Sequence, residues 1–256
     1  MQQLRNQKME LKQLVNYTRQ ILQVERFSDY CPNGLQVEGK SQVNKIVTGV
    51  SASMDFLKAA KSAGADAVLV HHGYFWKNEE ACLVGLKRNR IKFLLDNEIS
   101  LLAYHLPLDA HPELGNNAQL GTVLGLNVQA YTGNQGLIAQ GSLGESQTLE
   151  RFSEHVGNQL GRVPLVIGDL SRTIKNVAWC TGGAQGYIVD AIELGVDVFI
   201  SGEISEQTFH LARESGVAYI AAGHHATERY GIRALGEHLA NQFTLAHEFI
   251  DIDNPV

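Results

Sequence analysis

A short segment of the chain recurs in its second half, and this repeat limits the fold more than any other feature. Residues 60–72 align without gaps with residues 191–203, and each copy has a glycine and an aspartate before a continuous apolar run. Each copy also follows an apolar run, a loop of small residues and a helix-like segment, the order of a β-α-β unit. Continuously apolar strands are typical of parallel sheets that are covered on both faces. We therefore predict an α/β protein with two topologically similar domains, although β-α-β units also resemble one another generically.

The length and composition of the chain allow two domains. Its 256 residues are 44% hydrophobic, which is enough for two buried cores. From residue 126 the sequence becomes rich in glycine and glutamine. We place the first domain at residues 1–127 and the second at residues 128–256, and we expect a ligand site in the cleft between them.

Histidine and acidic side chains follow predicted strands at the point where each strand ends. The first run ends in His71 and His72, and the next strand is followed by His105 and Asp109. Open α/β sheets bind ligands beyond the carboxyl ends of their strands, so these side chains are candidates for one site. Neighbours on a regular strand point to opposite faces, but Gly73 permits a turn that lets both histidine rings converge.

A further group opens a predicted helix after the strand at residues 217–222. His224 and Glu228 are four residues apart, so a helix places them on one face, whereas His225 points elsewhere. Together, the histidines and acids offer more ligands than one tetrahedral zinc site needs, and they suit two divalent ions. Because the set contains no thiolate, it favours zinc, iron or manganese.

Two such ions lower the pKa of a bridging water and stabilise charge on a substrate oxygen, so the ligands predict metal-assisted hydrolysis. His105 is a metal ligand, an orienting residue or a proton shuttle, because ligating imidazoles need a partner group. His225 is either a substrate contact or a residue of the helix surface. Glu203, which aligns with His72 in the repeat, is either a pocket acid or a structural carboxylate. We expect Cys180 to be inert core, and we expect no site role for five other histidines: His111, His155, His210, His238 and His247.

The charge and cysteine content argue against several classes of protein. A net charge of -6 is unlike that of a general nucleic-acid binder, which carries a basic surface. The three cysteines are widely spaced and form neither a disulfide framework nor a CxxC zinc site. The sequence has neither an apolar signal-like start nor a run long enough for a transmembrane helix. We expect a cytoplasmic protein that acts on a small molecule and contacts neither a membrane nor nucleic acid.

Three blocks of the sequence resemble the signature blocks of a known family, the GTP cyclohydrolase I type 2 homologue or Nif-three-like dinuclear-metal family. The blocks are residues 68–73, 105–109 and 223–228, and the resemblance extends over nearly the whole chain. It implies two similar α/β domains with a dinuclear metal site between them, in subunits that form a toroidal homohexamer. It also implies opening of the GTP imidazole ring at C8 by metal-activated water. The metal ligands that it implies are His71, His72, Asp109, His224 and Glu228.

We therefore expect a hydrolase that depends on two divalent metal ions per subunit and acts on GTP, another nucleotide or a related heterocycle. The catalytic candidates are His105 and His225, either of which would move protons. The alternative is a non-catalytic metal-binding ring protein, either a metal chaperone or a regulatory or DNA-repair-associated factor.

Overall fold

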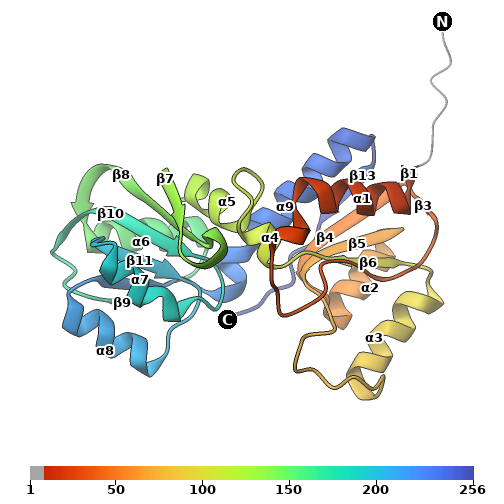
Figure 1. Cartoon of the computed structure of the whole chain (residues 1–256), viewed down its shortest axis with the longest axis horizontal. Helices are drawn as coiled ribbons and strands as arrows, with labels where there is room; N and C mark the ends of the chain where they lie inside the picture. Colours follow the sequence, from red (N-terminus) through yellow and green to blue (C-terminus); the bar gives the residue numbers. More distant parts are fainter. Residues whose placement is uncertain (1–8) are drawn as a thin grey trace, which may run out of the picture. The chain divides into compact units, whose positions relative to one another are not determined.

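The computed structural model describes residues 9–256, which form two compact units, each built around its own sheet (Figure 1). Unit 1 contains the described residues up to Leu108 together with Ile232–Ile252. Unit 2 contains Asp109–Gly231 and Asp253–Val256. Within residues 9–256, every helix is too short or too polar to cross a membrane.

Both units are discontinuous in sequence, whereas the prediction divided the chain once, after residue 127; residues 1–8 of that prediction lie outside the described part. The chain returns to unit 1 near its end, where strand β13 (Ala246–Phe249) pairs in parallel with β4 (Lys45–Ser51). Helix α9 (His224–Phe243) accordingly contributes residues to both units.

The sheet of unit 1 has the strand order β13-β4-β5-β6-β2. The pairs from β13 to β6 are parallel, and β2 is antiparallel to β6. The central strand β5 (Ala67–His72) carries the histidine pair at its carboxyl end. The other bounds are β6 Ser100–Ala103 and β2 Gly34–Val37, with a separate antiparallel pair of β1 Met9–Glu10 and β3 Gln42–Val43.

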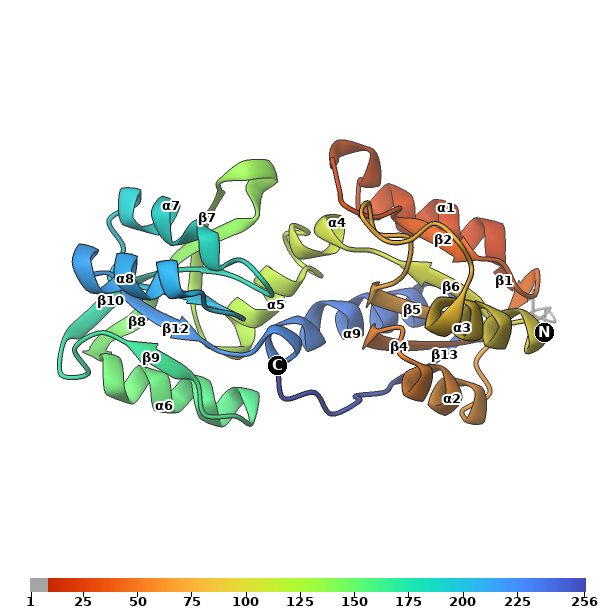
Figure 2. The ribbon, with the colours of Figure 1, turned by 90° about the horizontal axis from the view of Figure 1, so that it is seen from below.

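Helices cover both faces of this sheet. In two views α1 lies on one face, and α2 and α3 lie on the other (Figure 2). The side chain of Ser53 accepts a hydrogen bond from Phe56 N and so caps α2. Phe56, Leu57 and Leu94 are fully buried against the strands. The bounds are α1 Leu11–Ile21, η1 Val24–Arg26, α2 Met54–Ser62, α3 Gly85–Asp96 and α4 Leu106–Asp109.

The sheet of unit 2 has the strand order β7-β8-β10-β11-β12-β9. Strands β10, β11 and β12 are parallel, while β8 and β9 pair antiparallel with β10 and β12, and β7 is antiparallel to β8. The bounds are β7 Asn127–Thr132, β8 Ile138–Thr148, β9 Leu165–Ile167, β10 Thr173–Cys180, β11 Val198–Ser201 and β12 Ala218–Ala221.

Helix α6 packs on one face of this sheet, and α7 and α8 lie on the other (Figure 2). Trp179 of β10 and Phe152 of α6 are fully buried in the core on the α6 face. The bounds are α5 Asn116–Val123, η2 Asn134–Gly136, α6 Leu149–Leu160, η3 Gln185–Tyr187, α7 Ile188–Glu193 and α8 Glu206–Ser215.

The sequence repeat corresponds to a repeat in topology. In both sheets three parallel strands are followed by one antiparallel edge strand: β4-β5-β6 with β2, and β10-β11-β12 with β9. The α/β class is therefore right, but both sheets are mixed rather than purely parallel. The long hairpin of β7 and β8 fills the glycine-rich region, where the sequence offered no regular apolar pattern.

Candidate metal centre

The carboxyl end of β5 brings two imidazole rings together. The ring centroids of His71 and His72 lie 4.6 Å apart. His71 is fully buried and His72 is partly exposed. Gly73 is needed for space rather than for a left-handed turn: a Cβ there would lie 2.2 Å from Oε1 of Gln36 and 2.6 Å from the Cβ of Ala103. The two rings therefore lie side by side, and Gly73 allows Gln36 and Ala103 to pack closely beside them.

Each of these two rings is hydrogen-bonded through its Nδ1 atom. Nδ1 of His71 lies 2.9 Å from the carbonyl oxygen of Tyr104. A carbonyl only accepts, so Nδ1 carries a proton, and in the neutral ring the lone pair lies on Nε2. Nδ1 of His72 lies 3.2 Å from Oγ of Ser51, a hydroxyl that can donate or accept. Both rings are thus bonded within unit 1 through Nδ1, and Nε2 is the nitrogen that each would use to bind a metal ion.

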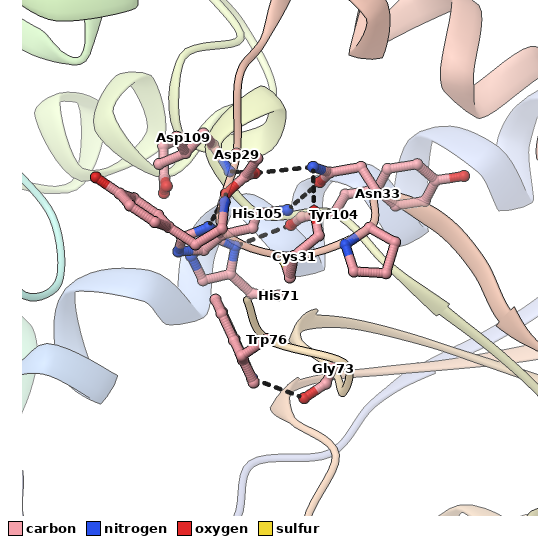
Figure 3. Close-up of polar contacts among 12 residues, drawn as sticks. Asp29, Cys31, Asn33, His71, Gly73, Trp76, Tyr104, His105 and Asp109 are labelled. Atoms are coloured by element: carbon pink, nitrogen blue, oxygen red, sulfur yellow. Dashed lines mark hydrogen bonds and ion pairs between the residues drawn. The ribbon is translucent and has the colours of Figure 1, made fainter. Parts of the chain in front are cut away.

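His105 completes a group of three imidazoles in unit 1. Its ring centroid lies 5.1 Å from that of His71 and 5.8 Å from that of His72. One ring nitrogen from each of the three histidines lies within 4.8 Å of the others. Trp76 meets the ring of His105 edge-on, with 5.0 Å between centroids, and donates from Nε1 to Gly73 O (Figure 3).

A loop that the sequence analysis did not single out holds His105. Oδ1 of Asp29 lies 2.7 Å from Nδ1 of His105, and Oδ1 of Asn33 accepts from His105 N at 2.7 Å (Figure 3). Burial opposes the charge of Asp29, but hydrogen bonds from His105 and Asn33 and the charge of His105 lower its pKa overall. Asp29 and His105 are 76 residues apart along the chain, so no local sequence pattern pointed to their contact.

Unit 2 holds Asp109 in a buried amide network. The side chain of Asp109 is nearly inaccessible, and its Oδ1 accepts from Nδ2 of Asn116 at 2.8 Å. Asn117 donates to the carbonyl of Asp109 and accepts from Thr181 N, while its own carbonyl accepts from Nε1 of Trp179. These bonds connect α5 to β10 and fix the carboxylate of Asp109 at the end of α4.

His224 and Glu228 lie in the first turn of α9 and contact each other. Nε2 of His224 lies 3.2 Å from Oε2 of Glu228, and Nδ1 lies 2.6 Å from Oε1 of Glu203. Burial lowers the pKa of His224, but hydrogen bonds and charges from Glu228 and Glu203 outweigh it and raise the pKa to about 9. Glu203 therefore contacts a predicted site residue, and its role as a pocket acid stays a prediction.

Glycines make room for this group. Gly182 has φ +68, and a Cβ there would lie 2.0 Å from Oε1 of Glu228. A Cβ at Gly202 would lie 2.6 Å from the Cα of His224. The loop after β10 and the end of β11 thus approach α9 more closely than any side chain would permit.

His225, Cys180 and the histidines that were expected to have no site role lie among structural contacts. His225 is buried, and its backbone N–H donates to Val256 O at 3.0 Å. Cys180 is buried, and burial together with the charges of Asp109 and Glu228 raises the pKa of its thiol well above the usual value. Structural hydrogen bonds engage four histidines that were expected to have no site role: His111, His155, His238 and His247.

The predicted metal ligands divide between the units. Unit 1 supplies His71 and His72 beside His105, and unit 2 supplies Asp109, His224 and Glu228. In both units the side chains are largely buried and of the types that bind divalent metals, so they are consistent with a metal site. The fold and these ligands define an α/β protein of two related units with histidine and carboxylate groups at strand ends.

Comparison with known proteins gives the family. The model of the Duf34/NIF3 family (NGG1p interacting factor 3) matches residues 9–255. A Pseudomonas aeruginosa protein named GTP cyclohydrolase 1 type 2 homolog is 56% identical over 248 residues, which cover 96% of this chain and 98% of the relative. The Escherichia coli K12 protein of the same name is 53% identical, with 96% and 98% covered. The chain therefore belongs to the Duf34/NIF3 family, as the resemblance of its motifs implied.

Solved structures agree with this assignment. The protein ybgI is 52% identical to this chain and superposes with a TM-score of 0.94, over 97% of this chain and 100% of ybgI. A protein from Thermus thermophilus is 34% identical and has a TM-score of 0.88, with 97% and 100% covered.

Proposed function

We propose that this protein is a hydrolase that depends on two divalent metal ions. The observation that supports the proposal is the hydrogen bonding of its histidine rings. Nδ1 of His71 is bonded to a carbonyl, and Nδ1 of His105 and of His224 to a carboxylate. Metal-binding imidazoles in proteins have this arrangement, because the partner on one nitrogen fixes the other toward the ion.

The two ligand sets complement each other. Unit 1 offers imidazoles, and unit 2 offers the carboxylates of Asp109 and Glu228 together with His224. Carboxylates can bridge two ions, whereas imidazoles bind one each, so we propose that His71, His72, Asp109, His224 and Glu228 together hold the pair. Nitrogen and oxygen donors without thiolate favour zinc, iron or manganese. Divalent ions there would supply Lewis acidity, which lowers the pKa of water and stabilises negative charge on a substrate oxygen.

The protein's own residues would position the substrate and transfer protons. His105 lies beside His71 and His72, and His225 is buried next to His224 in α9. We propose that one of these two histidines transfers a proton during hydrolysis. Trp76 presents an aromatic ring against His105 and His72, which suits a planar heterocycle. The names of the curated relatives support GTP or a related nucleotide as the substrate, and the family resemblance supports a homohexamer.

Metal analysis combined with an activity screen tests this proposal. Metal-free protein would be loaded with Zn²⁺, Mn²⁺ or, without oxygen, Fe²⁺, and then assayed with GTP, other nucleotides and phosphoesters. We expect about two ions per chain and turnover that Glu228→Gln abolishes. His210→Ala is the matched control, because His210 is exposed on α8. Two ions without turnover on any substrate would instead support the non-catalytic metal-binding alternative, and absence of metal binding would refute both.

A further inference from the structure

The strongest feature outside the predicted ligand set is the buried carboxylate of Asp29. Its side chain is only 3% exposed, and both of its oxygens are engaged. Oδ1 accepts from Tyr30 N at 2.6 Å and contacts Nδ1 of His105 at 2.7 Å. Oδ2 accepts from Nδ2 of Asn33 at 2.8 Å and from Leu106 N at 3.0 Å. Burial of an ionised group is costly unless it is hydrogen-bonded, and the four contacts of Asp29 offset this cost. One of these contacts is to the ring of His105.

The loop that carries Asp29 is hydrogen-bonded to both the ring and the backbone of His105. Asp29 binds the ring, and Asn33 accepts from the backbone N–H of the same residue. The amide of Asn33 also bonds the second oxygen of Asp29, so the two loop side chains support each other. Fixing both the backbone and the ring of one residue leaves that side chain little rotational freedom. The loop is therefore a clamp for His105.

We propose that Asp29 is a positioning residue that holds His105 as the tautomer protonated on Nδ1. A carboxylate accepts a hydrogen bond from Nδ1–H, so in the neutral ring the lone pair lies on Nε2. Nε2 of His105 is then available beside His71 and His72, and one ring nitrogen from each of the three histidines lies within 4.8 Å of the others, close enough to bind one cation. Asp29 thereby makes His105 a further metal ligand of the unit 1 group, and the proton transfer proposed above then falls to His225. This inference rests on the proposed metal-dependent function.

The tautomer itself is measured without metal. Histidine ring ¹⁵N NMR on the metal-free full chain at neutral pH, with His105 assigned from a His105→Gln spectrum, reports which nitrogen carries the proton. We expect Nδ1–H in the wild type and a large population of Nε2–H in Asp29→Asn, because the carboxamide can donate to Nδ1. An Nε2–H tautomer in the wild type would overturn the proposal without any variant.

Metal affinity provides the second readout. Outer partners of metal-binding histidines change metal affinity by roughly 10- to 100-fold, so Asp29→Asn is expected to weaken Zn²⁺ or Co²⁺ binding by this factor in chelator competition. Asp66→Asn is the matched control, because Asp66 is also partly buried in unit 1 and bonds the backbone N–H groups of Asn44 and Lys45 but no histidine. We expect it to lower stability and to leave both the His105 tautomer and the metal affinity unchanged.

A double-mutant cycle tests whether Asp29 acts through His105. If it does, adding Asp29→Asn to His105→Ala causes no further loss of affinity. An equal loss in both backgrounds would overturn the proposal.

A thiolate-to-Co²⁺ charge-transfer band that disappears in Cys31→Ser would also overturn it, because Asp29 would then be a ligand in a group with Cys31 and His105. Absence of any metal binding, with the expected tautomer intact, would refute the proposed function and the metal-binding role of His105, but not the clamp on His105.

Discussion

Oε1 of Glu203 lies 2.6 Å from Nδ1 of His224, at the opposite end of the ring from Oε2 of Glu228. His224 therefore lies between two carboxylates, one at the end of β11 and one on its own helix. The carboxylate of Glu203 holds the ring through Nδ1. The carboxylate of Glu228 contacts Nε2, the nitrogen that we propose binds a metal ion. Asp29 and His105 form the same kind of pair in unit 1.

Replacing Glu203 tests the first of these carboxylates. Glu203→Gln removes the charge that favours the Nδ1 proton of His224, so we expect metal affinity to fall by roughly 10- to 100-fold while the fold survives. Chelator competition with Zn²⁺ measures the effect. Glu206→Gln is the control, since Glu206 is exposed at the start of α8. Unchanged affinity in Glu203→Gln would assign Glu203 the structural role instead.

The raised pKa of His224 predicts proton release on metal binding. In the metal-free protein its pKa is about 9, so at pH 7 the ring is protonated and must lose Nε2–H before a metal ion binds there. We expect release of about one proton per His224 site at pH 7 and an apparent affinity that falls about tenfold per pH unit below 9. Isothermal titration calorimetry in buffers of different ionisation enthalpy counts the protons. Identical heats in all buffers would contradict the prediction.

The same pKa shift affects the stability of the metal-free protein in a defined direction. The pKa of His224 is raised from 6.5, so its stabilising contribution is complete below pH 6.5 and is lost as the pH rises toward 9. Denaturant unfolding of wild type and His224→Gln across this range isolates the contribution. The wild type should lose its advantage over the variant as the pH rises, and a constant difference would argue against the shift.

The sequence indicated which side chains come together on one element better than it indicated their hydrogen-bond partners on other elements. His224 and Glu228 are four residues apart, so helical geometry alone places them on one face. The pairing of Asp29 with His105 joins positions 76 residues apart, and no local periodicity encodes it. Glu203 was noticed only because the repeat aligned it with His72. Local rules thus find side chains on one element, whereas contacts between a loop and a strand end depend on the tertiary fold.

The fold shows the same limit. The parallel cores of both sheets follow from continuous apolar runs such as that of β5, because burial on both faces removes alternation. The antiparallel hairpin of β7 and β8 was missed, since its exposed strand β7 carries little apolar signal. A last strand that returns to a sheet was expected in the tail, but its pairing with β4 of unit 1 was not, because a four-residue edge strand does not specify its partner.

Gly182 gives a test of the space around Glu228. Gly182→Ala places a methyl group at the Glu228 carboxylate and also strains a left-handed backbone, which costs about 1–2 kcal/mol by itself. We expect a loss of stability above this value together with loss of metal binding. Gly195→Ala is the matched control, because Gly195 has φ +65 in the same unit with no atom within 4 Å. Calorimetric unfolding and metal analysis compare the stability and the metal content of the two variants. Equal stability and equal metal content would mean that the carboxylate of Glu228 tolerates displacement.

His247 predicts a second pH effect, in unit 1 and with the opposite sign. Its Nε2 lies 2.9 Å from Oγ1 of Thr48, and Gly236 leaves no space for any side chain beside the ring. Burial lowers the pKa of His247, assisted by the charge of Arg233 and opposed by the acids Glu237 and Glu248. The unfolded chain therefore takes up a proton at a higher pH than the folded chain does, so stability is complete above pH 6.5 and falls as the pH drops below it. Urea unfolding of the metal-free protein between pH 7.5 and 5.5 should show this loss, and His247→Gln should remove that part of it. Because the contribution of His224 changes only above pH 6.5, the two effects occupy separate ranges, and identical slopes for wild type and His247→Gln would show that His247 is not the group responsible.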